Sequence, residues 1–466
     1  MILNETIFRA YDIRGKADMA FDAEGFYVLG KAIITYVKKT EEPKSQRTKV
    51  FVSGDGRLSM PDLYGALIKG LEDEGCLVTR GGMLTTPLNY FAFHEGDFDL
   101  GLQISASHNP WHDNGLKLTG RRGAICGDQI QEIKEIAYQL MEDNSIKYQG
   151  LSIKGMVLDA AGYADRYIAK LKSVVGDQAP KKIVLDSGNA IPGSFYPEVL
   201  RSFGHEIIEL YCDLDARFPN HQPDPEEAEN VRFCQGKVLE TGADFGLSFD
   251  GDGDRVGVVL RDGTLLNADK ILYVLAADML SRNPGEKVVV DAMSSDTLAS
   301  KIRGIGGTVI RSKTGHSFIE EAMEHHHALL GGEQSGHFMF GENFYGHDDA
   351  ALASLRFLGA VESDPTLIKD VTINWPKMRE YAEKFVVDDT QKFQIMENYV
   401  AIMKKKFPEA DTIDGIRISF GDDEWAIVRP SNTSPKISVR IEGVSEASLE
   451  AKKEVLVGAL QELIRL

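Results

Sequence analysis

Short hydrophobic runs recur three times along the chain in the same order. A first run begins with lysine, continues with β-branched residues and ends in a small or acidic turn. A second run opens on glycine after a helix-length interval, and a third ends in a loop rich in Gly, Ser, Asp or Glu. The first runs are residues 49–55, 182–188 and 287–292, the second are 75–78, 204–208 and 306–310, and the third are 100–104, 245–249 and 328–330. Such runs, separated by helix-length segments, predict βαβ units with buried, mostly parallel strands. Chance recurrence of βα units is the alternative, and the shared order of the three copies favours a true repeat.

The pattern changes after about Asn374. Three further runs follow at 415–420, 424–429 and 436–442, and the last alternates apolar with polar residues, as in a strand with one buried face. Ser445 can cap a final helix whose leucines lie near one face. This segment predicts a smaller α+β domain with an antiparallel sheet.

The predicted fold class is therefore α/β, with three tandem related domains that have mixed, mostly parallel sheets and a smaller α+β domain at the C-terminus. The expected boundaries are 1–154, 155–264, 265–372 and 373–466. In parallel α/β sheets, ligands bind at the loops that leave the carboxyl ends of the strands. The loops after the third run of each copy are thus the first places to look for chemistry.

Composition narrows the function classes. The 466 residues include 52 Lys and Arg against 71 Asp and Glu, a net charge of −19, which disfavours binding to nucleic acid or to an anionic membrane. No apolar run approaches the roughly 18 residues of a membrane span, and residues 1–6 have no secretory-signal pattern. The four cysteines lie far apart and suit a reducing compartment. We expect a cytoplasmic protein of several domains.

The strongest chemical signal is the segment 250–255, in which Asp250, Asp252 and Asp254 alternate with glycines and Arg255 follows. Three carboxylates at every second position can surround one hard cation such as Mg²⁺ and leave coordination positions open. An EF-hand is excluded, because Arg255 and Arg261 stand where that loop needs Gly and Glu. A surface acidic turn is the alternative, but the three like charges repel unless a cation neutralises them.

A second signal is Ser105-Ala106-Ser107-His108-Asn109-Pro110, with Lys117 just beyond. A serine at a strand end, beside a histidine and near a lysine, is typical of an activated hydroxyl nucleophile. From the residue types alone, a capped turn is equally compatible with this segment.

Two further loops suggest ligand contacts. In 331–337, Glu333 and Ser335 could hold neighbouring sugar hydroxyls, although an ordinary loop fits the residues as well. In 429–434, the guanidinium of Arg429 and several hydroxyls could bind a phosphate, with a hairpin turn as the alternative.

With these residues in view, the chain resembles the α-D-phosphohexomutase family over essentially its whole length, and within it the bacterial phosphomannomutase/phosphoglucomutase members. The matching segments are residues 8–15, 105–110, 218–224, 250–255, 313–317, 332–337 and 429–433. The resemblance implies four domains around a central active-site cleft. It also implies an isomerase that moves a phosphoryl group between the 1- and 6-positions of mannose or glucose phosphate through a phosphoserine and a hexose 1,6-bisphosphate.

The resemblance further implies residue roles. Ser107 would be the phosphorylated residue, and Asp250, Asp252 and Asp254 would hold one Mg²⁺ together with an oxygen of that phosphate. Residues around the transferring group would stabilise it, flank it or move a proton, namely Arg14, His108, Lys117, Arg255 and His337. Substrate contacts would come from Tyr11, Lys313, His316, Glu333, Ser335, Arg429, Ser431, Asn432 and Thr433.

The alternatives lie in the sugar and in the reaction. Asn432 resembles the mannose and glucose members, whereas the form of 332–337 is also found in phosphoglucosamine mutases, and Met293 stands where some mannose/glucose members have lysine. A metal-dependent sugar phosphatase is disfavoured by the phosphate-binding loop at 429–433. A non-catalytic phosphosugar sensor is disfavoured by the complete set of Ser107, Lys117 and the three aspartates. We expect a small phosphosugar substrate and hexose 1,6-bisphosphate as activator, with no nucleic acid, membrane or obligatory protein partner.

Overall fold

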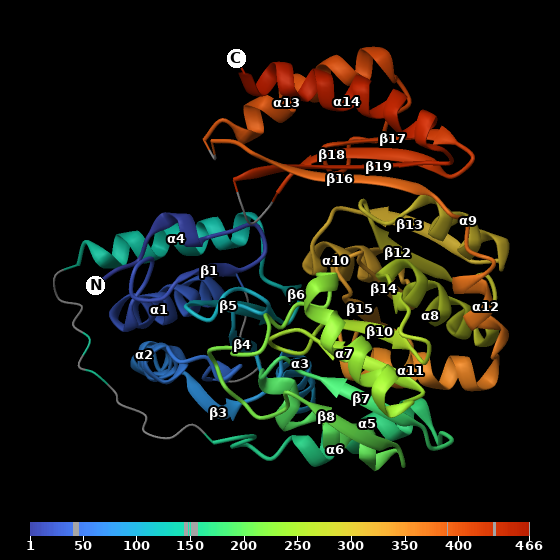
Figure 1. Ribbon diagram of the computed structural model, residues 1–466. Helices are drawn as coiled ribbons and strands as arrows, with labels where there is room; N and C mark the ends of the chain where they lie inside the picture. The colour runs from blue at the N-terminus through green and yellow to red at the C-terminus, as the bar shows by residue number, and fades with distance from the viewer. Residues whose placement is uncertain are drawn as a thin grey trace. The chain divides into compact units, whose positions relative to one another are not determined.

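The computed structural model describes residues 1–40, 46–143, 148, 150, 157–388, 390–431 and 435–465 (Figure 1). The chain forms two compact units. Unit 1 comprises Met1–Asn267 and Ser335–Glu362, and unit 2 comprises Ala268–Gln334 and Ser363–Leu466. The expected boundary between 154 and 155 lies outside the described residues, and the division into four domains stays a prediction.

The first sheet of unit 1 has the order β1-β5-β4-β2-β3, with β6 paired to β5. Strands β3, β2 and β4 are parallel to one another, whereas β5 runs antiparallel to both β4 and β1. Helices α1, α2 and α4 cover the apolar core of this sheet with buried side chains. The bounds are η1 Glu5–Ile7, β1 Ile13–Lys16, α1 Ala23–Thr40, β2 Lys49–Gly54, α2 Met60–Asp73, β3 Leu77–Met83, α3 Thr86–Glu95, β4 Leu100–Ile104, β5 Asp113–Gly120, β6 Gly123–Ala124 and α4 Asp128–Met141.

The second sheet of unit 1 has the order β11-β10-β9-β7-β8, again with a parallel core and antiparallel strands on one side. Its elements are α5 Ala164–Val175, β7 Lys182–Asp186, η2 Ile191–Ser194, α6 Tyr196–Ser202, β8 Glu206–Leu210, α7 Ala228–Thr241, β9 Phe245–Phe249, β10 Val256–Leu260 and β11 Leu265–Leu266. Unit 1 also contains β15 Phe338–Phe340 and all but the last residue of α11 Ala350–Ser363.

Unit 2 holds the third parallel core, in the order β13-β12-β14. The elements in the first segment of unit 2, Ala268–Gln334, are α8 Ala268–Arg282, β12 Lys287–Asp291, α9 Asp296–Gly304, β13 Thr308–Ser312, α10 His316–His326 and β14 Leu330–Gly332. In all three copies the first predicted run is therefore the middle strand, flanked in parallel by the second and the third. The predicted repeat with parallel strands is confirmed, and the structure shows in addition that the three copies share one spatial order of strands.

The C-terminal part of unit 2 is a four-stranded antiparallel sheet in the order β16-β19-β18-β17. Figure 1 shows α13 and α14 on one face of this sheet, where their apolar side chains form a shared core with it. Ser445 Oγ accepts a hydrogen bond from Ser448 N at 3.2 Å at the start of α14, as expected of a cap. The bounds are α12 Thr366–Thr372, β16 Arg379–Val386, α13 Lys392–Lys406, β17 Ile416–Gly421, β18 Glu424–Pro430, β19 Lys436–Gly443 and α14 Glu446–Arg465.

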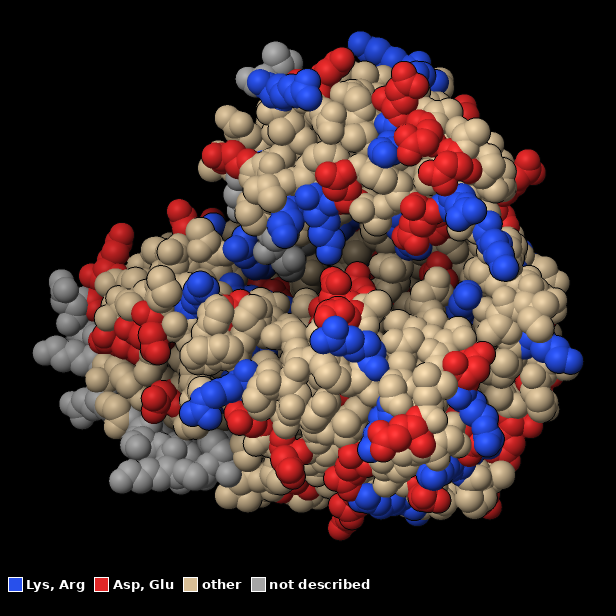
Figure 2. All heavy atoms as spheres, in the orientation of Figure 1, with Lys and Arg blue, Asp and Glu red and all other residues tan. Residues whose placement is uncertain are grey.

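Among the described residues, the structure contains no helix that is both long and apolar enough to span a membrane. Acidic and basic side chains are interspersed over the face shown in Figure 2.

Candidate active site

Ser107 lies in the loop that turns the chain from β4 back into the antiparallel strand β5. Its backbone has a φ of 47°, in the left-handed region that non-glycine residues seldom adopt. Ser107 N donates to Ser105 Oγ at 2.8 Å, and Ser107 Oγ donates to Asp250 Oδ2 at 2.5 Å, with His108 Nδ1 at 3.2 Å. The serine side chain thus points at the first carboxylate of the aspartate segment, 143 residues away in sequence.

Asp250, Asp252 and Asp254 lie in the corresponding loop of the second sheet, between β9 and β10. All three are fully buried, and one carboxylate oxygen from each lies within 4.8 Å of the others. Asp250 Oδ1 shapes the loop by accepting hydrogen bonds from the backbone N–H groups of Gly253, Asp254 and Arg255 at 3.0–3.1 Å. The glycines permit this tight turn, and Gly253 has a φ of 80°.

These carboxylates fit a bound cation. Asp252 Oδ1 is buried and has no hydrogen-bond partner among the described residues. Burial and the neighbouring charges of Asp254 and Asp252 raise the pKa of Asp250 well above its usual value. A buried group of three carboxylates that repel one another and include a free oxygen is what a divalent cation with oxygen ligands would stabilise.

Lys117 and Arg255 supply positive charge to the same place. Lys117 projects from β5, and its ammonium forms ion pairs with Asp252 at 2.8 Å and with Asp254. Although burial alone would lower the pKa of Lys117, those two carboxylates raise it well above its usual value. Arg255 Nε lies 3.2 Å from Asp250 Oδ2, and its Nη1 lies 3.3 Å from Asp224 Oδ1 in the 218–224 segment.

Arg14 and His108 complete the surroundings of Ser107. Arg14 Nη1 donates to Asn109 Oδ1 at 3.2 Å and its Nη2 pairs with Asp12 at 2.5 Å, while Arg14 Nε is buried without a hydrogen-bond partner among the described residues. Burial, with Arg255 and Arg14 nearby, lowers the pKa of His108 well below its usual value, so its imidazole is neutral. Although burial alone would lower the pKa of Arg14, Asp12 and the nearby, half-buried Tyr11 raise it above its usual value.

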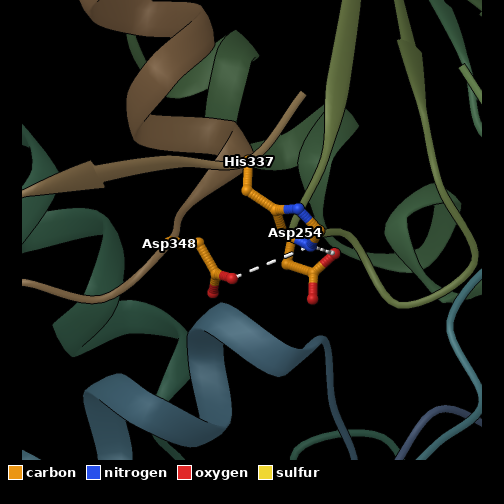
Figure 3. A group of neighbouring side chains, drawn as sticks. All are labelled: Asp254, His337 and Asp348. Atoms are coloured by element: carbon orange, nitrogen blue, oxygen red, sulfur yellow. Dashed lines mark ion pairs between the residues drawn. The ribbon is translucent and has the colours of Figure 1, made fainter. Parts of the chain in front are cut away.

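His337 faces the site from the segment before β15 (Figure 3). Its Nε2 lies 3.4 Å from Asp254 Oδ1 and 3.9 Å from Asp348 Oδ2, and its Nδ1 lies 2.9 Å from Ser335 Oγ. Figure 3 shows the carboxylates of Asp254 and of Asp348, in the segment that leads into α11, directed at the same ring nitrogen of His337. Asp348 does not stand out in the sequence, because an Asp-Asp pair before a helix is typical of a helix cap.

Of the residues predicted to contact the substrate, Tyr11 and Ser335 belong to unit 1 and all the others belong to unit 2. Glu333 is buried, and its Oε1 accepts a hydrogen bond from Gly315 N at 2.5 Å, which ties the Glu333 loop to the 313–317 segment. His316 Nδ1 lies 3.8 Å from Glu320 Oε1, and the exposed Lys313 lies over the Phe318 ring. Glu333 and Ser335 belong to different units, so their predicted joint role stays a prediction.

Arg429 stands at the end of β18 and is almost fully buried. Its Nε donates to Asp414 Oδ2 at 2.7 Å, whereas its Nη2 is buried without a hydrogen-bond partner among the described residues. Asp414 Oδ2 also accepts from Thr314 N at 3.1 Å, so one carboxylate links Arg429 to the 313–317 segment. Sequence reasoning missed Asp414. Ser431 is half-buried, and Asn432 and Thr433 lie outside the described residues.

Comparison with known proteins shows which family the chain resembles. Four family models match it in order: the alpha/beta/alpha domains I, II and III of phosphoglucomutase/phosphomannomutase at residues 5–144, 161–263 and 267–377, and the C-terminal domain at 383–458. A phosphomannomutase/phosphoglucomutase from Pseudomonas syringae pv. tomato is 36% identical over 463 residues, covering 99% of this chain and 96% of that one. A phosphoglucomutase from Neisseria gonorrhoeae is 35% identical over 455 residues, covering 96% and 95%.

The fold leads to the same family. The crystal structure of a phosphoglucomutase/phosphomannomutase family protein from Burkholderia thailandensis superimposes with a TM-score of 0.86 at 33% identity, over 99% of this chain and 98% of that one. The chain therefore belongs to the phosphoglucomutase/phosphomannomutase family, and it is an isomerase of the phosphomutase type.

Proposed function

We propose that this protein moves a phosphoryl group between the 1- and 6-positions of mannose or glucose phosphate through a phosphorylated Ser107. The observation that carries this proposal is the contact between Ser107 Oγ and Asp250, within a buried group of three carboxylates and Lys117. Phosphoryl transfer depends mainly on positioning and charge stabilisation, and this arrangement supplies both around one hydroxyl.

In the proposed reaction, the bond between phosphorus and Ser107 Oγ breaks while a bond forms from phosphorus to the free hydroxyl of a hexose monophosphate. The product is a hexose 1,6-bisphosphate, which turns around and returns its other phosphate to Ser107. The acceptor hydroxyl gives up its proton as the bond forms, with His337 as our candidate for taking it up, and Ser107 Oγ regains a proton as it leaves phosphorus. Arg14, Lys117 and Arg255 hold the phosphoryl oxygens, and the neutral His108 flanks Ser107.

Asp250, Asp252 and Asp254 would hold the metal ion, for which we propose Mg²⁺ with an oxygen of the phosphoserine as a further ligand. When bound, the ion would supply positive charge against the phosphoryl oxygens. Lys117 already neutralises part of the carboxylate charge through its ion pairs with Asp252 and Asp254.

In unit 2, we propose that Arg429 binds the substrate phosphate that is not reacting. Its buried Nη2 has no hydrogen-bond partner among the residues that the structure describes, which supports this role, because a guanidinium binds phosphate through two parallel N–H groups. Ser431, Asn432 and Thr433 would add donors, while Tyr11, Lys313, His316, Glu333 and Ser335 would contact the sugar. A phosphate site of this kind also favours a mutase over a phosphatase, since hydrolysis has no need to rebind a bisphosphate.

The sugar is the open part of the proposal, with phosphoglucosamine mutase as the second candidate. A phosphorus NMR time course with mannose 1-phosphate, Mg²⁺ and a trace of glucose 1,6-bisphosphate tests it. We expect a 6-phosphate signal to grow without free phosphate. Growth of inorganic phosphate would indicate a phosphatase, and an unchanged spectrum followed by turnover of glucosamine 6-phosphate would identify the second candidate.

Replacing the nucleophile tests the mechanism. Ser107→Ala should abolish turnover while the protein stays folded, because the side chain that carries the phosphoryl group is lost. The assay is the same NMR time course, with circular dichroism as the check on folding. Undiminished isomerase activity in this variant would exclude Ser107 as the nucleophile.

A further inference from the structure

The loop that carries Ser107 is held from behind by a single buried arginine. Arg57 lies between β2 and α2, and its side chain is 1% exposed. Its Nη2 donates to the carbonyl oxygens of Ser107 and Asn109 at 2.5 and 2.9 Å, and its Nη1 donates to those of Pro110 and Asp113 at 2.8 and 2.9 Å. Its Nε donates to Asp55 Oδ2 at 3.0 Å. Every N–H group of this guanidinium therefore donates a hydrogen bond, and four of the five bonds go to carbonyl oxygens of the loop that carries Ser107.

A second side chain holds the same loop from a different element. Gln222 Nε2 donates to the carbonyl oxygens of His108 and Asn109 at 2.6 and 2.9 Å. Gln222 belongs to the segment that also carries Asp224, the ion-pair partner of Arg255. The carbonyls of the four consecutive residues 107–110 are thus bound to Arg57, Gln222 or both.

This arrangement has a consequence for the reacting group. Ser107 keeps a positive φ only if its surroundings impose it, because serine has no intrinsic preference for that region. Carbonyl oxygens that bind Arg57 and Gln222 cannot turn toward the phosphoryl group, where their partial negative charge would repel it. The same contacts fix the direction of the Ser107 side chain toward Asp250.

Arg57 and Gln222, which together form a clamp on the Ser107 loop, are also linked to the aspartate loop. Asp55 Oδ2 accepts the hydrogen bond of Arg57 Nε, and it lies 2.8 Å from Ser105 Oγ. Ser105 Oγ in turn lies 2.9 Å from Asp252 Oδ2 and accepts the hydrogen bond of Ser107 N. A displacement of Arg57 would therefore change the positions of both Ser107 and Asp252.

We infer that Arg57 and Gln222 are positioning residues for phosphoryl transfer, which hold Ser107 Oγ in line with the acceptor hydroxyl without touching the substrate. This inference rests on the proposed role of Ser107. It assigns to Arg57 an effect on the rate of transfer rather than on the binding of the sugar phosphate.

Arg57→Lys tests the inference, because lysine keeps the charge but cannot bind four carbonyls from one planar group. We expect kcat to fall about 100-fold, as for a reacting atom displaced by about 1 Å, with KM nearly unchanged. The phosphorylation of Ser107 by glucose 1,6-bisphosphate can be monitored by mass spectrometry of the intact protein. Its rate should fall by a similar factor to kcat. In Arg57→Ala, added methylguanidine should restore part of the rate.

The matched control is Arg356→Lys. Arg356 is likewise buried and pairs with the carboxylate and the carbonyl oxygen of Glu342, but it contacts no residue of the 105–113 loop. We expect it to lower the unfolding temperature with kcat unchanged. An equal fall of kcat in both variants, or a kcat within threefold of wild type in Arg57→Lys, would overturn the inference.

Gln222→Met offers a milder test that leaves the core intact, since methionine has a similar shape and no donors. Loss of these hydrogen bonds should lower kcat about tenfold. Gln235→Met is its control, because Gln235 donates to the carbonyl of Gly263 at 2.7 Å, outside the site. An unchanged kcat in Gln222→Met would remove Gln222 from the clamp. Activity in Ser107→Ala would instead refute the proposed function, so the two failures are distinguishable.

Discussion

At the scale of single residues, the Ser107 loop and the aspartate loop approach each other as closely as backbone atoms permit. A Cβ atom at position 251 would collide with the carbonyl group of Ser107 and contact Pro223. Gly251 is therefore required by space rather than by its dihedral angles, since its φ is not in the left-handed region. The glycines of the alternating Asp-Gly segment have different purposes, because Gly253 does need a positive φ.

Gly251→Ala should separate the two loops. We expect turnover to fall about 100-fold through misplacement of Ser107 relative to the carboxylates, together with weaker Mg²⁺ binding. Steady-state kinetics across a Mg²⁺ titration measure both effects. Gly236→Ala is the control, because a Cβ there meets nothing within 4 Å on helix α7. The alanine should stabilise this helix by about 1 kcal/mol and leave turnover unchanged. Wild-type kinetics in Gly251→Ala would contradict the close-approach explanation.

At the scale of secondary-structure elements, the start of α11 contains a carboxyl group with an unusual environment. Asp349 is fully buried, and its Oδ1 accepts a hydrogen bond from Leu352 N at 2.9 Å. Tyr167 OH donates to the same carboxyl group at 2.8–2.9 Å. Burial raises the pKa of Asp349 to about 7 despite these hydrogen bonds.

The pH dependence of stability follows from the sign of this shift. Because the pKa is raised in the folded state, the contribution of Asp349 to stability is complete below about pH 4 and is lost as the pH rises toward 7. Within that window the loss amounts to about 1.4 kcal/mol per pH unit. Asp349→Asn keeps the cap and removes the titration, so its stability relative to wild type should rise between pH 5 and pH 8 in urea unfolding.

Asp364→Asn provides the control for this measurement. Asp364 is exposed, and hydrogen bonds from Thr366 lower its pKa below the usual value. A depressed pKa gives a contribution that is lost only as the pH falls below about 4. The difference between this variant and wild type should therefore stay constant from pH 5 to pH 8. A constant difference in Asp349→Asn as well would show that Asp349 is ionised in the folded protein throughout that range.

At the scale of the whole molecule, the chain concentrates buried negative charge at one place in an already acidic protein. With 52 basic and 71 acidic residues, long-range electrostatics does not favour further burial of carboxylates. The cluster of Asp250, Asp252 and Asp254 is nevertheless fully buried. A cation that binds the folded state and not the unfolded chain would therefore stabilise the entire fold.

Addition of Mg²⁺ should raise the unfolding temperature. At a concentration a hundred times the Kd, the expected gain is about 2.7 kcal/mol at 25 °C. Differential scanning calorimetry with and without EDTA measures it, with sodium chloride at equal ionic strength to separate general screening. Asp252→Asn should weaken the response to Mg²⁺. A Mg²⁺ response of equal size in Asp252→Asn and wild type would place the stabilising cation elsewhere.

Several features follow from the sequence because they depend on local composition and order. The lysine-led runs predicted the middle strands β2, β7 and β12, and the glycine-led runs predicted the flanking strands β3, β8 and β13. The three aspartates converge because their spacing within one short loop leaves few alternatives. Strand β16 escaped prediction, since an edge strand with mostly exposed side chains has no clear hydrophobic pattern.

Other features required the tertiary structure, because they join residues that are distant in the chain. No local pattern predicts that Ser107 meets Asp250, that Asp348 lies beside His337, or that Asp414 pairs with Arg429. Arg57 in particular looks like an ordinary turn residue in the sequence, and only its contacts with four carbonyls reveal its place behind Ser107. The repeat, the mostly parallel direction of its strands and the kinds of residue available for phosphoryl transfer could be read from the amino-acid sequence alone. The tertiary structure decided which of them meet, because hydrogen bonds and ion pairs act over a few ångströms in space regardless of separation along the chain.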